Sequence, residues 1–243
     1  MKGIDISDYQ RGLDVASLKS KGIGFAILKL GYGTTIIDSC FSQFYDQAVS
    51  AGIPVGAYFY SLATTEAEAI RDAKKALSIA NGRKLPLGIY MDVEEKSQLA
   101  LRDSVLTGVV KAFCDTIRAG GYIPGAYGSS GNLWAKVGPS YVGDDILVWK
   151  AQWSSYCPNN CDLWQYSATT RIDGYNGPVD GDESVSNRFM ELIAKGYGSE
   201  VKPEPEPEST PEQISNEQEY TIEIPAGKSI EEIIIRVKFK NAE

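Results

Sequence analysis

Three carboxylates end the apolar run GIYMDVEE at residues 88–95. Side chains alternate between the two faces of a strand, so we expect Asp92 and Glu94 to share one face, with Glu95 as a solvated residue on the other. Residues two apart along a strand are separated by about 6.5–7 Å. Two carboxyl groups at this range, one protonated and one ionised, can hydrolyse a glycosidic bond. The run therefore predicts a catalytic pair, and the alternative is a strand end that simply reaches solvent.

Two further acidic residues stand near the ends of the strand-like pattern. Asp5 ends the first apolar run, and Asp180 follows the last strand-like region. First and last strands are neighbours where a barrel closes, so both side chains could converge on Asp92 and Glu94. Crowded like charges disfavour full ionisation and keep one carboxyl protonated near neutral pH. A general acid needs this proton.

Composition excludes several other kinds of chemistry. The 243-residue chain has no histidine, which excludes triads with a histidine base and zinc hydrolases with histidine ligands. Of its four cysteines only Cys157 and Cys161 are close in sequence, so we predict buried thiols or a local disulfide, and neither a metal site nor a cofactor. The net charge is −8, so no basic surface for nucleic acid is expected, and no apolar run is long enough for a membrane helix.

The elements that must position these residues follow an alternating pattern. Strand-like runs cover residues 3–6, 24–30, 54–60, 86–94, 123–127, 146–152 and 162–166, and helical stretches cover about 38–50, 65–80, 101–119 and 184–195. This alternation is typical of βα units around a parallel sheet. One αβ unit is repeated at 51–61 and 119–130, which favours a barrel or an open doubly wound sheet. In a barrel, the carboxyl ends of the strands would bring the acidic residues to one face.

Several short motifs occur in order over residues 1 to about 195. They are GIDIS at 3–7 with Gln10, ILK at 27–29 with GYG at 31–33, AGIPVGAY at 51–58, DVE at 92–94, WQY at 164–166 and VD at 179–180. In this order the chain resembles a family 25 glycoside hydrolase, the Chalaropsis-type lysozymes. The resemblance implies an α/β fold, an irregular TIM-like (β/α) barrel of about eight strands. It also implies cleavage of the β-1,4 bond between N-acetylmuramic acid and N-acetylglucosamine in peptidoglycan.

The resemblance also implies roles for the four carboxylates. Glu94 would be the general acid, with Asp92 as its partner near the anomeric centre, and Asp5 and Asp180 would complete the acidic cluster. Two positions depart from the family pattern. Phe59 stands where relatives often have histidine, and Gly-Asp-Glu-Ser follows Asp180 in place of Leu-Asn. The first departure leaves the acid in place but changes the groove, and the second bears on the assignment of Asp180.

Aromatic side chains at strand ends are candidate substrate-binding residues, because sugar rings pack their C–H faces on aromatic rings. The candidates by position are Tyr58, Tyr60, Tyr127, Trp149, Trp153 and Tyr166, with Gln165 and Gln152 as hydrogen-bonding neighbours. Core packing is the alternative, and we expect it for about half of these aromatics.

A change of composition after Gly198 indicates further parts. We divide the chain into a catalytic domain at 1–198, a proline- and glutamate-rich linker at 199–217 and a small β segment at 218–243. The last segment has two alternating runs, enough for a β-hairpin-like appendage but too few for a stable isolated domain. It could bind the cell wall or form a homo-oligomer, and the alternative is a disordered tail.

The implied protein is a muramidase whose partner is bacterial peptidoglycan. The N-terminus has acidic residues where a signal peptide needs an apolar core. We therefore expect synthesis in the cytoplasm of a phage-infected bacterium and action on the wall after release, as a phage endolysin; the alternative is a bacterial enzyme exported by another route. The alternative is a non-catalytic peptidoglycan-binding protein on the same fold, which loss of an acidic residue would favour. An amidase or peptidase would need the histidine or metal ligands that the sequence lacks.

Overall fold

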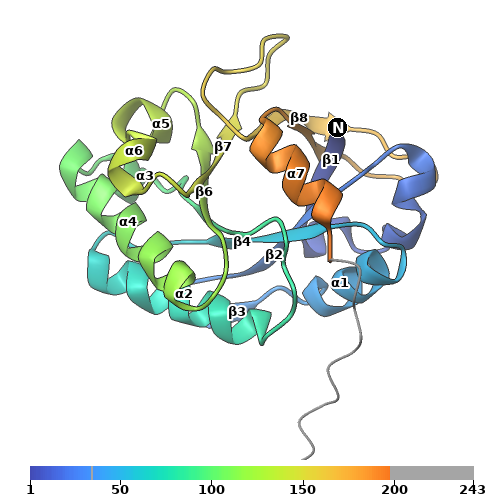
Figure 1. Ribbon diagram of the computed structural model, residues 1–243, viewed down its shortest axis with the longest axis horizontal. Coiled ribbons are helices and arrows are strands. Elements are labelled where there is room, and N and C mark those ends of the chain that lie inside the picture. Colours follow the sequence, from blue (N-terminus) through green and yellow to red (C-terminus); the bar gives the residue numbers. More distant parts are fainter. Residues whose placement is uncertain (34, 198–243) are drawn as a thin grey trace, which may run out of the picture. The chain divides into compact units, whose positions relative to one another are not determined.

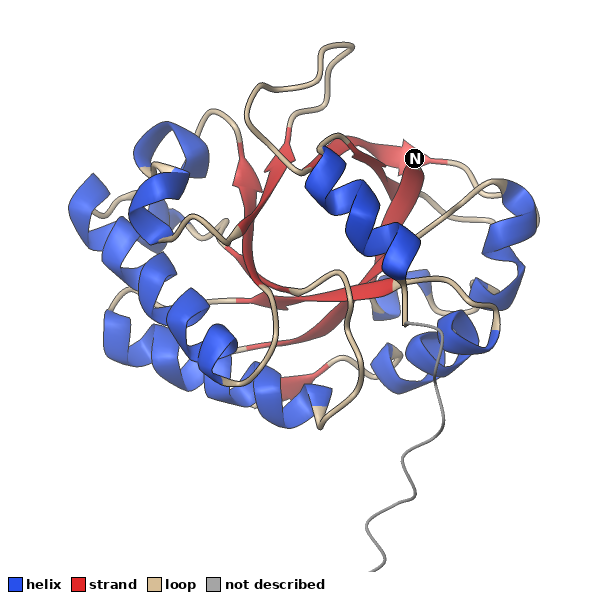
Figure 2. Ribbon diagram, in the orientation of Figure 1, coloured by secondary structure: helices blue, strands red, loops and turns tan. Residues whose placement is uncertain are grey.

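Eight strands close into a β-barrel with helices packed around it (Figures 1 and 2). The structure is a computed structural model that describes residues 1–33 and 35–197. The strands are β1 (Lys2–Ile6), β2 (Ala26–Tyr32), β3 (Ile36–Ile37), β4 (Val55–Tyr60), β5 (Ile89–Asp92), β6 (Pro124–Ser129), β7 (Leu147–Ala151), β8 (Leu163–Thr170) and β9 (Val179–Ser184). The α-helices are α1 (Phe41–Ser50), α2 (Glu66–Ala80), α3 (Lys96–Leu99), α4 (Asp103–Ala119), α5 (Leu133–Lys136), α6 (Pro139–Val142) and α7 (Asn187–Lys195), and two 3-10 helices cover Asp8–Gln10 and Val15–Lys21.

The barrel order is β1-β9-β8-β7-β6-β5-β4-β2, closed by the pairing of β1 with β2, and β3 is a short extension beside β2. All neighbouring barrel strands are parallel except β9, which runs antiparallel to both β8 and β1. The predicted α/β barrel is therefore confirmed. Strand β9 was not expected from the sequence: Asp180 does not follow the last strand but lies inside β9, and the last helix begins only at Asn187.

Two calls from the sequence lie outside the described residues. These are the linker at 199–217 and the β segment at 218–243 with its expected wall-binding or oligomerising role. Among the residues that are described, no helix is long and apolar enough to cross a membrane.

Glycines allow β5 to enter the barrel wall beside β6. Gly88, just before β5, has a φ of +85°, and a Cβ there would lie 2.7 Å from the carbonyl oxygen of Ile123. Gly125 in β6 leaves room for the Tyr90 ring, since a Cβ at Gly125 would lie 2.4 Å from it. A larger residue at either position would therefore push β5, which ends at Asp92, away from β6.

Strand parity separates two apolar clusters. Ile89, Met91 and Val93 belong to the larger cluster between the strands and the surrounding helices, whereas Tyr90 belongs to a smaller cluster inside the barrel. This is the predicted alternation for the run at 88–95, because a strand presents successive side chains to opposite faces. Asp92 shares the inward parity of Tyr90.

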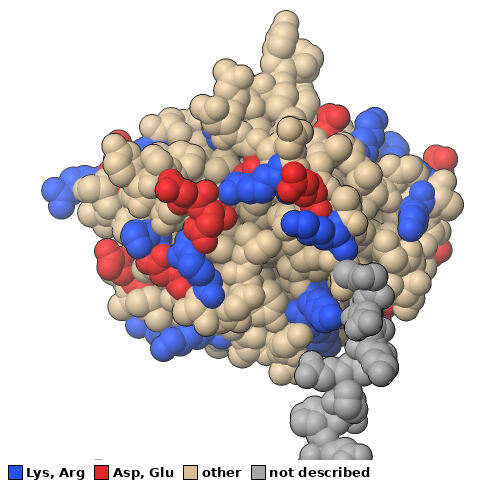
Figure 3. All heavy atoms as spheres, viewed as in Figure 1, with Lys and Arg blue, Asp and Glu red and all other residues tan. Residues whose placement is uncertain are grey.

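Helix α7 covers the amino-terminal end of the barrel interior. Phe189 and Ile193 of α7 are buried in the inner cluster with Phe25, which precedes β2, and the rings of Phe25 and Phe189 meet edge to face at 5.4 Å. Burial of a phenylalanine side chain contributes about 1.5–3 kcal/mol. Figure 3 shows acidic and basic side chains interspersed on the face that carries α7. The opposite end, at the carboxyl ends of the parallel strands, is called the barrel mouth below.

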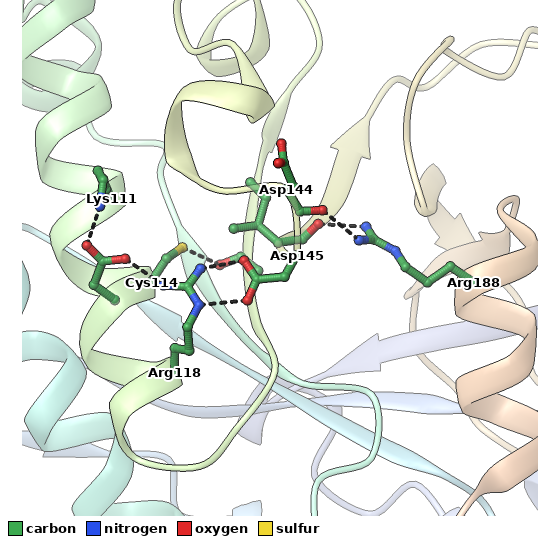
Figure 4. Close-up of polar contacts among 9 residues, drawn as sticks. Lys111, Cys114, Arg118, Asp144, Asp145 and Arg188 are labelled. Carbon is green, nitrogen blue, oxygen red and sulfur yellow. Dashed lines mark hydrogen bonds and ion pairs between the residues drawn. The ribbon is translucent and has the colours of Figure 1, made fainter.

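An ion pair and hydrogen bonds tie α4 and α7 to the segment just before β7, near the amino-terminal end (Figure 4). Arg118 of α4 donates two hydrogen bonds of 2.6 Å to Asp145, and Arg188 of α7 donates to the carbonyl oxygens of Asp144 and Ile146. Arg188 also pairs with Asp162, a buried carboxylate that accepts from Val148 N at 2.9 Å and Ser186 Oγ at 2.6 Å.

The cysteines match the sequence prediction only in part. Cys40 and Cys114 are buried free thiols, as expected, whereas Cys157 is an exposed free thiol and Cys161 a half-buried one.

Candidate active site

Four inward-facing aspartates lie on three strands at the barrel mouth. Asp5 of β1 is opposite Asp180 in the β1–β9 register, and Asp182 of β9 is opposite Gln165 of β8. Asp92 ends β5, between Tyr60 of β4 and Tyr127 of β6. The structure thus places Asp5 and Asp180 on the neighbouring strands β1 and β9, the first and last of the barrel along the chain. The charge of Asp5 helps raise the pKa of Asp92, and the charge of Asp180 helps raise that of Glu94, so the groups act on one another electrostatically.

Asp182 was not identified from the sequence. It is fully buried, and its Oδ1 accepts a 2.9 Å hydrogen bond from Trp149 Nε1, while Oδ2 meets no donor among the described residues. Asp5 is also buried and accepts a 2.9 Å hydrogen bond from Gln165 Nε2. Burial and the charge of Asp180 raise the pKa of Asp5 to about 8, and burial and the charge of Asp5 raise that of Asp182.

A proton on this pair explains the contact between the two carboxyl groups. The carboxyl groups of Asp5 and Asp182 are within hydrogen-bonding reach of each other. Two ionised carboxylates have no donor to offer, whereas a protonated one donates to the other. Because burial penalises the charged form, the pair keeps a proton in the neutral range.

Asp92 and Glu94 differ in exposure. Asp92 is 4% exposed, and burial, followed by the charge of Glu94, raises its pKa well above the usual value. Glu94 keeps contact with solvent at the barrel mouth. Partial desolvation by the protein around it raises the pKa of Glu94, as does the charge of Asp180. Glu94 is therefore a carboxyl group that has a raised pKa and remains accessible to a large substrate.

Glu95 differs from its prediction as a solvated residue. It is half-buried, and its Oε1 accepts a 2.7 Å hydrogen bond from the Tyr60 hydroxyl. The parity prediction is correct in that Glu95 does not join the inward carboxylates. Its contact with Tyr60 instead orients one of the predicted substrate-binding aromatics.

Lys29 is a second residue whose role the sequence did not reveal. It has the inward parity of Ile27 in β2, and its Nζ lies 5.4–5.9 Å from the ring centroids of four tyrosines. These rings belong to Tyr9, Tyr32, Tyr58 and Tyr60. The charge of Lys29 lowers the pKa of both Asp92 and Glu94, which opposes the effect of burial. The sequence signal that could have identified Lys29 is a lysine two residues after the inward-facing Ile27 in the same strand.

Trp149 does not lie where a sugar could stack on it. It is 1% exposed, and the rings of Tyr58, Tyr90 and Tyr127 surround it with centroid distances of 4.3–6.1 Å. Its Nε1 donates a hydrogen bond to Asp182. The predicted substrate contact of Trp149 is therefore wrong, and core packing, the alternative, applies. Its role here is to orient Asp182 through the hydrogen bond from Nε1.

The side-chain amide of Gln165 is likewise hydrogen-bonded within the protein. Its Oε1 accepts hydrogen bonds from the Tyr127 hydroxyl at 2.9 Å and from Trp153 Nε1 at 3.0 Å, and its Nε2 donates to Asp5. The side chain is buried. The predicted hydrogen bond from Gln165 to a sugar is replaced by a positioning role, because these three partners use most of the bonding capacity of the amide.

The remaining predicted aromatics keep some exposure at the barrel mouth. Tyr58, Tyr60 and Tyr166 are half-buried, Tyr127 is 7% exposed and Trp153 is 66% exposed. Beside Glu94, a cleft of about 420 Å³ opens between the carboxyl ends of β5, β6 and β7. Within residues 1–33 and 35–197, no group of three or more acidic, cysteine or histidine side chains is arranged to hold a metal ion.

Comparison with known proteins gives one family match, to the model described as "Glycosyl hydrolases family 25", over residues 4–175. The autolytic lysozyme of Clostridium acetobutylicum is 29% identical over 188 residues, covering 75% of this chain and 55% of the relative. Lysozyme M1 of Streptomyces globisporus is 29% identical over 197 residues, covering 74% of this chain and 66% of the relative. The chain thus spans less than two thirds of the length of either lysozyme.

Solved structures share the fold. The bacterial lysozyme from Streptomyces coelicolor superposes with a TM-score of 0.67 at 25% identity, covering 81% of this chain and 96% of that one. The catalytic domain of the endolysin ply40 from bacteriophage P40 of Listeria monocytogenes gives 0.67 at 24% identity, covering 79% and 97%. The modular autolysin LytC from Streptococcus pneumoniae, in complex with a synthetic peptidoglycan ligand, gives 0.62 at 22% identity, covering 74% and 46%.

Proposed function

Because the chain belongs to the glycosyl hydrolases of family 25, we propose that it hydrolyses the β-1,4 bond between N-acetylmuramic acid and N-acetylglucosamine in peptidoglycan. The observation that carries the proposal is the pair formed by Asp92 and Glu94. Both have raised pKa values, and only Glu94 reaches solvent. The sequence relatives described as lysozymes support the same substrate class.

Asp92 and Glu94 take different roles in the proposed reaction. With like charges close together, one carboxyl keeps its proton while the other ionises. Glu94, at the surface of the cleft, donates its proton to the leaving oxygen of the glycosidic bond. When Glu94 carries the proton of the pair, the carboxylate form of Asp92 stabilises the positive charge that develops at the anomeric centre. The charge of Lys29 lowers the pKa of both members and so favours ionisation within the pair.

The neighbouring Asp5 and Asp182 serve the pair indirectly. Their protonated state keeps additional negative charge away from Asp92, whose pKa the charge of Asp5 would otherwise raise further. Gln165 and Trp149 fix the orientation of the two carboxyl groups through one hydrogen bond each. We therefore treat both aspartates as positioning and charge-setting residues rather than as proton donors to substrate.

The test is digestion of purified cell wall with the full chain. We expect new reducing N-acetylmuramic acid ends, and we expect Glu94→Gln to lower their rate of release at least about 100-fold, because general acid catalysis contributes about 10²–10⁴-fold. The matched control is Glu191→Gln, an exposed glutamate on α7 at the other end of the barrel. New amino groups without reducing ends, or full activity of Glu94→Gln, would refute the proposal.

A non-catalytic peptidoglycan-binding protein is the alternative on the same fold. It is disfavoured because Asp5, Asp92, Glu94 and Asp180 are all present at the barrel mouth. In the same experiment such a protein would bind the wall and release no reducing ends.

A phage origin, with release to the wall after synthesis in the cytoplasm, stays a prediction. A structural neighbour is a phage endolysin. At 24% identity that likeness shows the fold alone.

A further inference from the structure

Two thiols converge in the loop between β7 and β8, which covers residues 152–162. Cys157 is exposed and Cys161 is half-buried. The Sγ atoms of both donate to the carbonyl oxygen of Pro158, at 3.5 Å from Cys157 and 3.2 Å from Cys161. The two sulfur atoms are also within hydrogen-bonding reach of each other. The loop therefore brings two free thiols to one point.

The sequence CPNNC at 157–161 explains why the two sulfur atoms meet. The ring of Pro158 fixes its φ at about −65°, which suits the start of a turn. Asn160 has a φ of +54°, in the left-handed region that asparagine tolerates better than most residues. Lys150 Nζ donates a 2.9 Å hydrogen bond to the carbonyl oxygen of Asn159, which ties the turn to β7. The turn thus holds the thiols together before any bond forms between them.

The two thiols differ in their surroundings. Cys157 lies at the surface, where a small molecule can reach it, whereas Cys161 packs against the larger apolar cluster. Burial, followed by the charge of Cys157, raises the pKa of Cys161 to about 12, and the charge of Lys150 opposes this effect. The thiolate is the reacting form in thiol–disulfide exchange. Cys157 is therefore placed to react first and Cys161 to react second.

We propose that Cys157 and Cys161 are a redox modification site, which a low-molecular-weight disulfide such as oxidised glutathione converts into a reversible intramolecular disulfide. The Cys157 thiolate attacks one sulfur of the small disulfide, which forms a mixed disulfide and releases one small thiolate. The Cys161 thiolate then attacks the Cys157 sulfur and releases the second small thiolate. The two cysteines are oxidised, the small disulfide is reduced to two thiols, and these take up the two protons that the cysteines lose.

The disulfide would restrain a loop that reaches the cleft at the barrel mouth. Gln152 and Trp153 of this loop line the cleft. Gln152 Nε2 donates a 2.9 Å hydrogen bond to the carbonyl oxygen of Tyr156, so the first half of the loop is already tied by the protein. A bond between Cys157 and Cys161 would close the second half. Neither sulfur takes part in the proposed hydrolysis, so this inference does not depend on it.

The first test counts thiols in the full chain after incubation with a mixture of oxidised and reduced glutathione. We expect the thiols that react after denaturation to fall from four to two, with both losses in the peptide that contains Cys157 and Cys161. Cys40 and Cys114 are internal controls, because they are 2% and 0% exposed and should stay reduced. Four remaining thiols, or a dimer linked through Cys157, would overturn the proposal.

Serine variants separate a pair of thiols from two independent ones. In Cys161→Ser the mixed disulfide cannot be resolved. We therefore expect glutathione on Cys157 to be at least about tenfold more abundant than in the unchanged chain, because a neighbouring thiol acts at a high effective concentration. Cys157→Ser should take up little glutathione, since the exposed thiol is absent. Equal glutathione on Cys157 in the unchanged chain and in Cys161→Ser would show that the two thiols do not act together.

Cleavage by chymotrypsin after Tyr156, which is 77% exposed, measures the restraint on the loop. We expect cleavage there to be at least about threefold slower in the oxidised than in the reduced chain, because a protease needs the loop to open locally. Cleavage after Tyr9, 84% exposed and outside the loop, should be equal in both forms. The oxidant should leave the rate at Tyr156 unchanged in Cys157→Ser. An equal rate at Tyr156 in a chain whose disulfide has formed would refute the restraint. These measurements use no glycan, so failure of the proposed hydrolysis would not alter them.

Discussion

Replacing Asp182 by asparagine tests whether a proton is held between the two buried aspartates. Asparagine keeps an oxygen that can accept from Trp149 Nε1, and its amide N–H can donate to Asp5 in place of the proton. The shape of the site is therefore conserved while one titratable group is removed. The change should act on the pH dependence of unfolding more than on packing.

The sign follows from the raised pKa of Asp182. Its folded pKa lies well above the value of 3.8 that the group has when exposed. Stability from such a group is fully present below the unfolded pKa and is lost as pH rises toward the folded pKa. Each pH unit in this window removes up to 1.36 kcal/mol per proton. Between pH 5 and 7 the unchanged chain should therefore lose up to about 2.7 kcal/mol that Asp182→Asn does not lose.

The assay is urea unfolding, followed by tryptophan fluorescence, at pH 4, 5.5 and 7. We expect Asp182→Asn to match the unchanged chain near pH 4 and to be the more stable protein at pH 7. Asp173→Asn, an exposed aspartate on the segment before β9, serves as the control and should follow the unchanged chain at every pH. Parallel pH curves for Asp182→Asn and the unchanged chain, or a destabilised variant at pH 7, would refute the protonated pair.

Two further predictions concern a cation and a buried carboxylate. Lys29→Gln removes a charge that lowers the pKa of Asp92 and Glu94, so both limbs of the pH–activity profile should move to higher pH, and an unmoved profile would show that Lys29 does not set these values. Asp162→Ala should lower the free energy of unfolding by about 3 kcal/mol, since it leaves Arg188 and a backbone amide without their acceptor; urea unfolding checks this, and the exposed Asp144→Ala should change it by less than about 0.5 kcal/mol.

Strand parity was enough to place Asp92, because a period of two admits only one face once the apolar residues are assigned to the other. Glu94 lies two residues beyond the end of β5, where parity no longer applies strictly. The same rule could have identified Lys29, two residues after the inward Ile27 in β2. It failed for β9, whose sequence VDGDES has little apolar character to mark a strand. That strand exists because it pairs with both β8 and β1 to close the barrel, a long-range condition that local sequence does not express.

Trp149 shows why residue type alone could not separate binding from support. Trp149 and Trp153 are only four positions apart and both stand near the end of β7, yet one is 1% exposed and the other 66%. Each donates its indole N–H to the acidic network, Trp149 directly to Asp182 and Trp153 through Gln165, which bonds to Asp5. The two rings therefore support the buried aspartates, one directly and the other through the Gln165 amide. Only the outer ring retains a free face, so the hydrogen bonds that reach the aspartate pair also fix the orientation of the exposed Trp153 ring.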